Sequence, residues 1–263
     1  MRDREIIKKN LKAGENLSHA LRVLTDSQLL ETSVCLRGKS PQRVKDFFAE
    51  AFQKDALCAE MLLLSKLLCK GKKSPTAKVR DRVRVSCIRN PLSLAAAHKM
   101  CASAANLMIS EESDFRSVCE AVSAKESDYA VLPMCSSEDG YYPTFSKLVK
   151  TYDLKICSSC TLTRDDSDEE VLLALLSRNI EIPEKPSHIV FSFVCDDEEL
   201  LPDLIGALKS GGCIPKSIIS SPFEYSMDIF EHRIEVKLCE TSPEAILFFL
   251  EAALPRHTVL GIY

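Results

Sequence analysis

Two serines and a glycine follow one short apolar run, and their types and spacing make them candidates for ligand chemistry. The run from Tyr129 to Leu132 predicts a buried strand, and the polar segment after it contains Ser136, Ser137 and Gly140. The hydroxyls and backbone amides of such a segment open at the carboxyl end of the strand, where ligands bind in α/β sheets. The segment is therefore predicted to contact a small polar ligand.

The other reactive side chains predict neither a metal site nor a redox site. Cys157 and Cys160 form the one CxxC pair among twelve cysteines, whereas a zinc ribbon needs a second pair and a thioredoxin-like site needs its own βαβ context. Reduced, buried cysteines of a cytosolic protein are the preferred interpretation. The acidic run at 165–170 lacks the alternation and central glycine of a calcium loop, so it is interpreted as a solvated loop.

Charge is distributed unevenly along the chain. Residues 1–78 contain 16 lysines and arginines against 9 aspartates and glutamates, and the remainder is acidic. Seven basic residues gather at the junction, namely Lys70, Lys72, Lys73, Lys78, Arg80, Arg82 and Arg84. No aromatic residues lie between these charges, so a solvated linker is preferred over a nucleic-acid site. Neither a signal peptide nor a membrane-spanning apolar run is found, and a soluble cytoplasmic protein is expected.

The pattern of secondary structure is clearest in residues 187–263. Their sequence predicts the order strand, helix, strand, strand, helix and strand. The run 188–194 is rich in β-branched and aromatic residues, which favours a strand. The next run has leucines at three- and four-residue spacing and stops at Gly211-Gly212, as a helix would. Ser242-Pro243 supplies a cap and a first-turn proline for the second helix. This order predicts a small α+β sandwich that binds a ligand or dimerises.

Two segments of this stretch resemble the ACT domain at the end of prephenate dehydratase. Residues 212–222 resemble that family's Gly-Ile-Asn-Leu-Thr-Lys-Ile-Glu-Ser-Arg-Pro signature, and residues 259–263 resemble its Val-Leu-Gly-Ser-Tyr ending. The resemblance implies a homodimer with a phenylalanine site at its interface, to which Gly212, Ile214 and Ser220 contribute. Ile214 stands where the family has asparagine.

A segment further upstream, residues 115–140, resembles the catalytic core of the same family through its AD-YGV-LPIENS-x-EG motif. The resemblance implies conversion of prephenate to phenylpyruvate, water and carbon dioxide by a carbon–oxygen lyase. Decarboxylation supplies the electrons, so no cofactor is implied. The expected ligand is prephenate or a related aromatic dicarboxylate.

The same resemblance assigns roles to individual residues. Ser136, Ser137 and Thr163 are the implied catalytic residues, which would polarise the leaving hydroxyl. Ser93 and Gly140 are the implied substrate-binding residues, and Ser93 is also a candidate cap for a helix that begins at Leu94.

The chain departs from the family where a second catalytic lobe is expected. About thirty residues separate the Leu-Lys-Ile segment at 154–156 from His188, and a single βαβ unit takes roughly that many. Asp165 follows Thr163-Arg164 where the family motif has phenylalanine. Two hypotheses follow. The chain is a divergent prephenate dehydratase, or it is a non-catalytic ACT-domain protein that binds or regulates in aromatic amino-acid metabolism.

The N-terminal end reads as helical. Ser40-Pro41 begins a helix with an apolar stripe, and the run 61–68 is apolar nearly all round and is predicted to be buried. Two interpretations stay open, a remnant of a chorismate mutase-like domain or an unrelated helical segment. The expected class is α/β plus α+β, with a helical domain at 1–75, a prephenate dehydratase-like (periplasmic-binding-protein-like) α/β domain at 80–182 and an ACT domain at 187–263.

Overall fold

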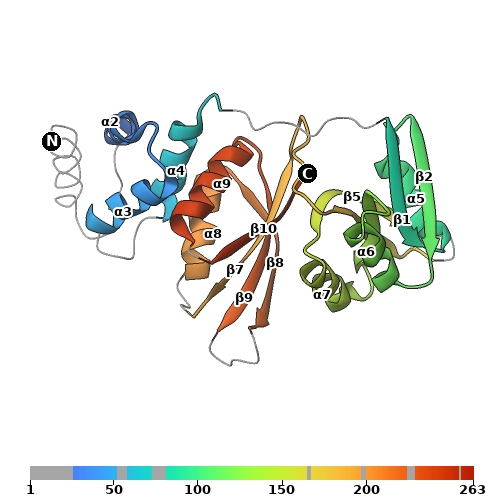
Figure 1. The fold of residues 1–263 in the computed structure, drawn as a ribbon. Helices are drawn as coiled ribbons and strands as arrows, with labels where there is room; N and C mark the ends of the chain where they lie inside the picture. Colours follow the sequence, from blue (N-terminus) through green and yellow to red (C-terminus); the bar gives the residue numbers. More distant parts are fainter. Residues whose placement is uncertain are drawn as a thin grey trace. The chain divides into compact units, whose positions relative to one another are not determined.

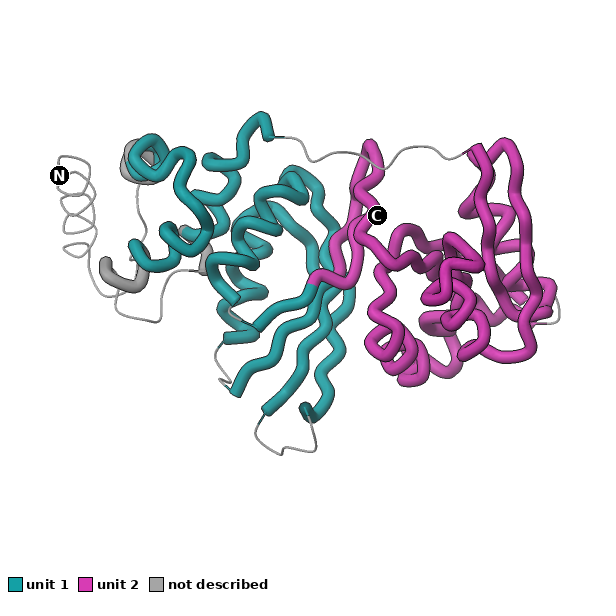
Figure 2. The backbone as a smooth tube through the Cα atoms, viewed as in Figure 1, with its two compact units in different colours: residues 1–74, 191–258 teal, residues 75–190, 259–263 magenta. Residues whose placement is uncertain are grey.

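The computed structural model describes residues 26–51, 58–72, 81–164, 167–196, 200–223, 229–254 and 256–263. The chain divides into two compact units, which Figure 2 distinguishes by colour. Unit 1 comprises residues 1–74 and 191–258, and unit 2 comprises residues 75–190 and 259–263. Parts of the predicted basic junction and of the acidic run at 165–170 lie outside the described residues, as do the first 25 residues.

Unit 2 is built around a sheet whose strands lie in the order β2-β1-β3-β6-β5. Its elements in chain order are β1 (Arg82–Ile88), α5 (Pro91–Met100), β2 (Asn106–Glu112), α6 (Phe115–Ser123), β3 (Tyr129–Ser136), β4 (Gly140–Tyr141), α7 (Pro143–Thr151), β5 (Lys155–Thr163) and β6 (Glu170–Ser177). Strands β1, β2 and β3 are parallel, and β6 is antiparallel to both β3 and β5. Strand β5 therefore points the same way as β3, so that the carboxyl ends of β1, β3 and β5 share one edge.

Both faces of this sheet are covered, which explains why its central strands β1, β3 and β6 are buried along most of their length. Helix α5 packs on one face with Val85, Val131 and Leu173. Helices α6 and α7 pack on the other face, where Leu132 and Phe145 are buried in a second apolar cluster. Figure 1 shows these elements in green to yellow. The last residues of the chain complete the unit, because Gly261 pairs with Ile156 of β5 in parallel register.

Residues 187–263, most of which belong to unit 1, have the predicted order of elements, and that order is confirmed. The elements are β7 (His188–Cys195), α8 (Leu200–Ser210), β8 (Ile214–Pro222), β9 (Phe230–Lys237), α9 (Pro243–Ala253) and β10 (His257–Ile262). The strands lie in the order β10-β7-β9-β8, so the crossover from β7 to β8 leaves room for β9 between them. Ile234 and Val236 on alternate positions of β9 are fully buried, as a period of two requires.

The N-terminal helices of unit 1 are α2 (Asp26–Leu36), α3 (Pro41–Ala51) and α4 (Cys58–Cys69). Helix α4 packs against both α8 and α9, and Leu62 and Leu64 are fully buried. The ammonium of Lys66 donates to the backbone oxygen of Gly211 at 2.9 Å, and the Thr241 hydroxyl donates to the same oxygen at 2.6 Å. The prediction of a buried apolar run at 61–68 is confirmed for these two leucines. Across the described ranges, no helix is long and apolar enough to cross a membrane.

Candidate functional site

A cavity of about 320 Å³ opens in unit 2 where strands β1, β3 and β5 end. Helices α5, α6 and α7 begin at the same edge, and the first turn of each contributes to the wall. The residues around it are Asn90, Leu92, Ser93, Phe115, Leu132, Pro133, Tyr142, Thr144, Phe145, Leu148, Arg164, Val171 and Leu173. The carboxyl ends of strands are the usual position for a ligand site in an α/β sheet.

The first turn of α5 forms one polar part of the wall. Asn90 has extended backbone angles, and its side-chain oxygen accepts a hydrogen bond from the Ser93 backbone N–H at 2.7 Å. Pro91 occupies the first helical position, where no N–H is needed. The expectation that Ser93 caps a helix from Leu94 is therefore wrong. Asn90 is the cap, and Ser93 is buried within the first turn.

Helices α6 and α7 begin differently. The Asp114 carboxylate caps α6 and accepts from the Ser117 backbone N–H at 2.9 Å, and this hydrogen bond lowers the pKa of Asp114. Helix α7 follows Tyr142, which makes no side-chain capping hydrogen bond. The Tyr142 hydroxyl instead donates to Asp139 at 3.4 Å. A fixed negative charge thus offsets the dipole of α6, whereas no capping side chain offsets that of α7.

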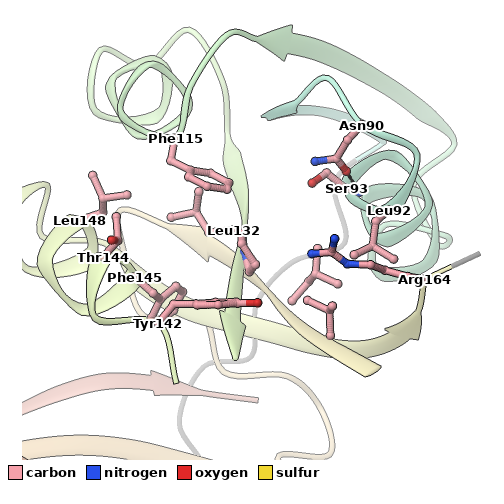
Figure 3. Close-up of a pocket in the computed structure, with 13 residues that line it drawn as sticks. Asn90, Leu92, Ser93, Phe115, Leu132, Tyr142, Thr144, Phe145, Leu148 and Arg164 are labelled. Atoms are coloured by element: carbon pink, nitrogen blue, oxygen red, sulfur yellow. Dashed lines mark hydrogen bonds between the residues drawn. The ribbon is translucent and has the colours of Figure 1, made fainter. Parts of the chain in front are cut away.

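Arg164 supplies the cation. Its Nε atom lies 2.7 Å from Oε2 of Glu169, and the backbone N–H of Arg164 donates to the Glu169 carbonyl at 3.0 Å. The arginine side chain is 49% exposed, whereas that of Glu169 is 7% exposed. Among the described residues that line the cavity, Arg164 is the only charged one. In Figure 3 it lies beside Asn90, Leu92 and Ser93, across from Phe115 and Tyr142.

A second cavity of about 580 Å³ adjoins the first on the side of α5. Asn90, Leu92 and Arg164 line both cavities, and Thr163 lines only the second. Thr163 is the last residue of β5 and Arg164 follows it, and both line the second cavity. The predicted residues Ser93 and Thr163 thus lie in adjoining cavities.

The other predicted catalytic-unit residues lie outside both cavities. Ser136 is buried, and its hydroxyl accepts from the Asp139 backbone N–H at 3.0 Å. The Ser137 hydroxyl accepts from the Glu170 backbone N–H at 3.0 Å. Gly140 begins β4 with a φ of +72°, a conformation that favours glycine. These contacts hold the turn after β3 and fasten it to β6.

The predicted effector residues lie in unit 1, spread along β8 and the turn before it. Gly212 has a φ of +82° after the end of α8, and Ile214 is the first residue of β8 and 48% exposed. The Ser220 hydroxyl lies 2.8 Å from Nδ1 of His232 on the neighbouring strand. Gly212 and Ser220 are therefore at opposite ends of the strand.

Sequence reasoning missed Arg164, Tyr142 and the capping role of Asn90. The sequence shows Arg164 as a basic residue directly after a predicted strand. Its position at the cavity, however, depends on β5 running parallel to β3, which the sequence does not show. The pair Asn90-Pro91 carried a stronger signal, because proline favours the first position of a helix and asparagine the position before it.

Comparison with known proteins identifies the class of fold. No protein-family model and no curated protein matches this chain. Solved prephenate dehydratases do match, from Streptococcus mutans (TM-score 0.54, 15% identity, 69% of this chain and 97% of that one) and from Arthrobacter aurescens in complex with L-Phe (0.53, 13%, 69% and 90%). A structure described as GqqA, a novel type of quorum quenching acylase, matches with a TM-score of 0.56 and 17% identity over 68% of this chain and 94% of that one.

At these identities the likeness concerns the fold alone. The chain has a distant prephenate dehydratase-like fold, and its chemistry must be argued from the cavity. Arg164 can hold a carboxylate, and Phe115, Phe145 and Leu148 can contact an aromatic or aliphatic body. Among the described residues around the cavity there is no Asp, Glu, His, Lys or Cys to exchange a proton with a bound ligand. Across the described part of the chain, no His, Cys, Asp and Glu side chains form a group of three that could hold a metal ion.

Proposed function

We propose that this chain is a prephenate dehydratase-like protein of aromatic amino-acid metabolism whose unit 2 binds a small aromatic carboxylate without dehydrating it. The observation that carries the proposal is the position of Arg164 across the cavity from an aromatic wall. An arginine presents several N–H donors in a plane and suits a carboxylate, while Phe115 and Phe145 suit a ring. A volume of about 320 Å³ lies within the range of small-molecule pockets.

Two features support binding over catalysis. Loss of a hydroxide is assisted by an acid that delivers a proton to the leaving oxygen, and the described lining of the cavity contains no Asp, Glu, His, Lys or Cys to deliver it. The connection from β5 to β6 is also short, because six residues separate Thr163 from Glu170. A second α/β lobe, which would exclude water from the cavity, does not fit in that connection.

Dehydratase activity itself is the second candidate. Thr163 favours it, because its exposed side chain lines the cavity that adjoins Arg164. Acyl hydrolysis, suggested by the acylase among the structural neighbours, has less support. Ser93 and Thr144 bring hydroxyls to the cavity, but a hydroxyl nucleophile needs an adjacent base to activate it, and the described lining offers none.

Unit 1 would supply assembly and regulation in this proposal. Strand β8 lies at the edge of its sheet, and Ile214 and Ile218 on it are 48% and 44% exposed. An edge strand with exposed apolar side chains is suited to pair with another chain. A homodimer formed along β8, with phenylalanine bound nearby through Gly212 and Ser220, remains our proposal for this unit.

The experiment that tests the function combines binding with turnover. Purified protein is titrated calorimetrically with phenylpyruvate and with prephenate, and phenylpyruvate formation from prephenate is measured in parallel. We expect binding without turnover, and we expect Arg164→Gln to weaken binding about tenfold or more, since a hydrogen-bonded charge pair is lost. Arg116→Gln is the matched control, because Arg116 forms an exposed pair with Glu120 on α6 outside the cavity.

If the unmodified chain converts prephenate, and Thr163→Ala or Ser137→Ala abolishes this turnover, the proposal is overturned in favour of dehydratase activity. Absence of binding by any aromatic carboxylate, in protein that melts cooperatively, would overturn both candidates for unit 2.

A further inference from the structure

The number of carboxylates that the cavity can hold follows from the charges around it. Arg164 is the only cation among the described residues that line either cavity. Its partner Glu169 is almost fully buried, and the two atoms Nε and Oε2 are 2.7 Å apart. The pair is therefore close to neutral as a whole. The outer edge of the guanidinium stays available, because 49% of the arginine side chain is exposed.

The helix ends add a limited positive potential. The N-termini of α5 and α7 both reach the cavity, and each is equivalent to about half an elementary charge. Together they amount to about one positive charge. Helix α6 adds none, because the Asp114 carboxylate caps it.

Two acidic side chains belong to segments that adjoin the cavity lining, whereas the basic Arg89, next to Asn90, is already paired with Glu111. Asp139 accepts from the hydroxyl of Tyr142, which lines the cavity, and Asp168 is an exposed residue of the connection that follows Arg164. A first carboxylate on Arg164 would use the available potential. A second carboxylate would meet Glu169 and Asp139 with no cation of its own, and an unpaired charge in a partly buried site is costly.

We infer that this cavity selects aromatic monocarboxylates over aromatic dicarboxylates, and that Glu169 is the residue that sets this selectivity. The inference rests on the proposed function, and it narrows the ligand class from the aromatic dicarboxylates that the sequence resemblance implies. Glu169 acts through Arg164, so it is a positioning residue. The Glu169 carboxylate holds the Arg164 guanidinium between the two cavities. It also neutralises the positive charge that would otherwise attract a second carboxylate.

The test uses two ligands that differ by one carboxylate, 3-phenylpropanoate and benzylmalonate. Calorimetric titration of the unmodified full chain at low salt should give at least tenfold tighter binding of 3-phenylpropanoate. Glu169→Gln removes the negative charge and keeps the shape. This variant should bind benzylmalonate about tenfold more tightly than the unmodified chain does, so that the preference narrows or reverses. Glu120→Gln, in the exposed pair on α6, should leave the preference unchanged.

Each outcome has a distinct meaning. If the unmodified chain binds benzylmalonate as tightly as 3-phenylpropanoate, the inference is wrong and the proposed function stands. If neither ligand nor phenylpyruvate binds, the proposed function fails. An unchanged preference in folded Glu169→Gln would show that Glu169 does not set the selectivity. The ratio in the unmodified chain decides the main point even if that variant does not fold.

Discussion

Helices α5 in unit 2 and α9 in unit 1 begin in the same way and face different surroundings. Each has a polar cap followed by proline, Asn90-Pro91 in α5 and Ser242-Pro243 in α9, and each cap accepts from the backbone N–H three residues on. The first turn of α9 is packed against α4, and the Cys69 thiol donates to the Glu244 carbonyl at 3.5 Å. The first turn of α5 opens on a cavity beside Arg164. The local sequence determines where each helix begins. Segments distant in the sequence determine whether the N-terminus of that helix is packed against the protein or borders a cavity that can bind a ligand.

The largest expected effect contrasts a crowded glycine with an open one. A Cβ atom on Gly261 would overlap the Ile156 carbonyl oxygen, a backbone atom in β5 that cannot move aside. Gly261→Ala should lower the free energy of unfolding by about 3 kcal/mol. Gly206, in α8, has no atom within 4 Å of a built Cβ, so Gly206→Ala should raise that free energy by about 0.5–1 kcal/mol. Urea denaturation of both variants measures the difference. Equal effects would contradict the described packing of Gly261 against β5.

A smaller effect tests the two helix ends directly. Asn90→Ala and Ser242→Ala each remove a capping acceptor, and each should lower the free energy of unfolding by about 1 kcal/mol. Only Asn90→Ala should also weaken binding of phenylpyruvate, by several fold, because only this cap borders the cavity. Chemical denaturation and calorimetric titration on the same two samples provide the comparison. Loss of binding in Ser242→Ala alone would place the ligand elsewhere.

The smallest effect contrasts a buried histidine in unit 1 with an exposed one in unit 2. His232 is 9% exposed, packs between Phe193 and Phe230, and burial lowers its pKa from 6.5. The His232 side chain therefore binds a proton more readily in the unfolded chain than in the folded chain. Stability contributed by the neutral side chain should be present above about pH 6.5 and be lost as the pH falls towards the lower folded pKa, with a slope no greater than about 1.4 kcal/mol per pH unit.

Thermal or urea unfolding of His232→Gln between pH 7.5 and 5 measures this contribution. The variant should show a shallower loss of stability in acid than the unmodified chain. His98→Gln, which changes an exposed histidine of α5, is the control for the loss of an imidazole at the surface. The interpretation of His232 fails if the two variants behave alike.

The sequence predicts the elements well and the site only in part, for physical reasons. Alternation in β9 and the glycines after α8 are local signals, so the order of elements over residues 187–263 could be predicted. The serines after β3 were identified from the same kind of local pattern, and they fasten a turn. Arg164 reaches the cavity only because β5 pairs with β6 and β6 pairs with β3. These pairings place the carboxyl end of β5 at the same edge of the sheet as that of β3. Such register depends on contacts between distant segments, which a single sequence does not reveal.

The contact of Lys66 and Thr241 with one carbonyl oxygen, that of Gly211, has a consequence for how the chain is made. Helix α4 emerges from the ribosome well before α8 and α9, the two helices of the C-terminal segment that pack against it. Translation proceeds at roughly 5–20 residues per second, so α4 waits about ten seconds or longer before α9 exists. Throughout that time its apolar surface is without its final cover, which makes the nascent chain a natural client for chaperones. A stop before residue 200 would remove both helices that pack on α4, and a stop between residues 211 and 242 would remove α9 alone.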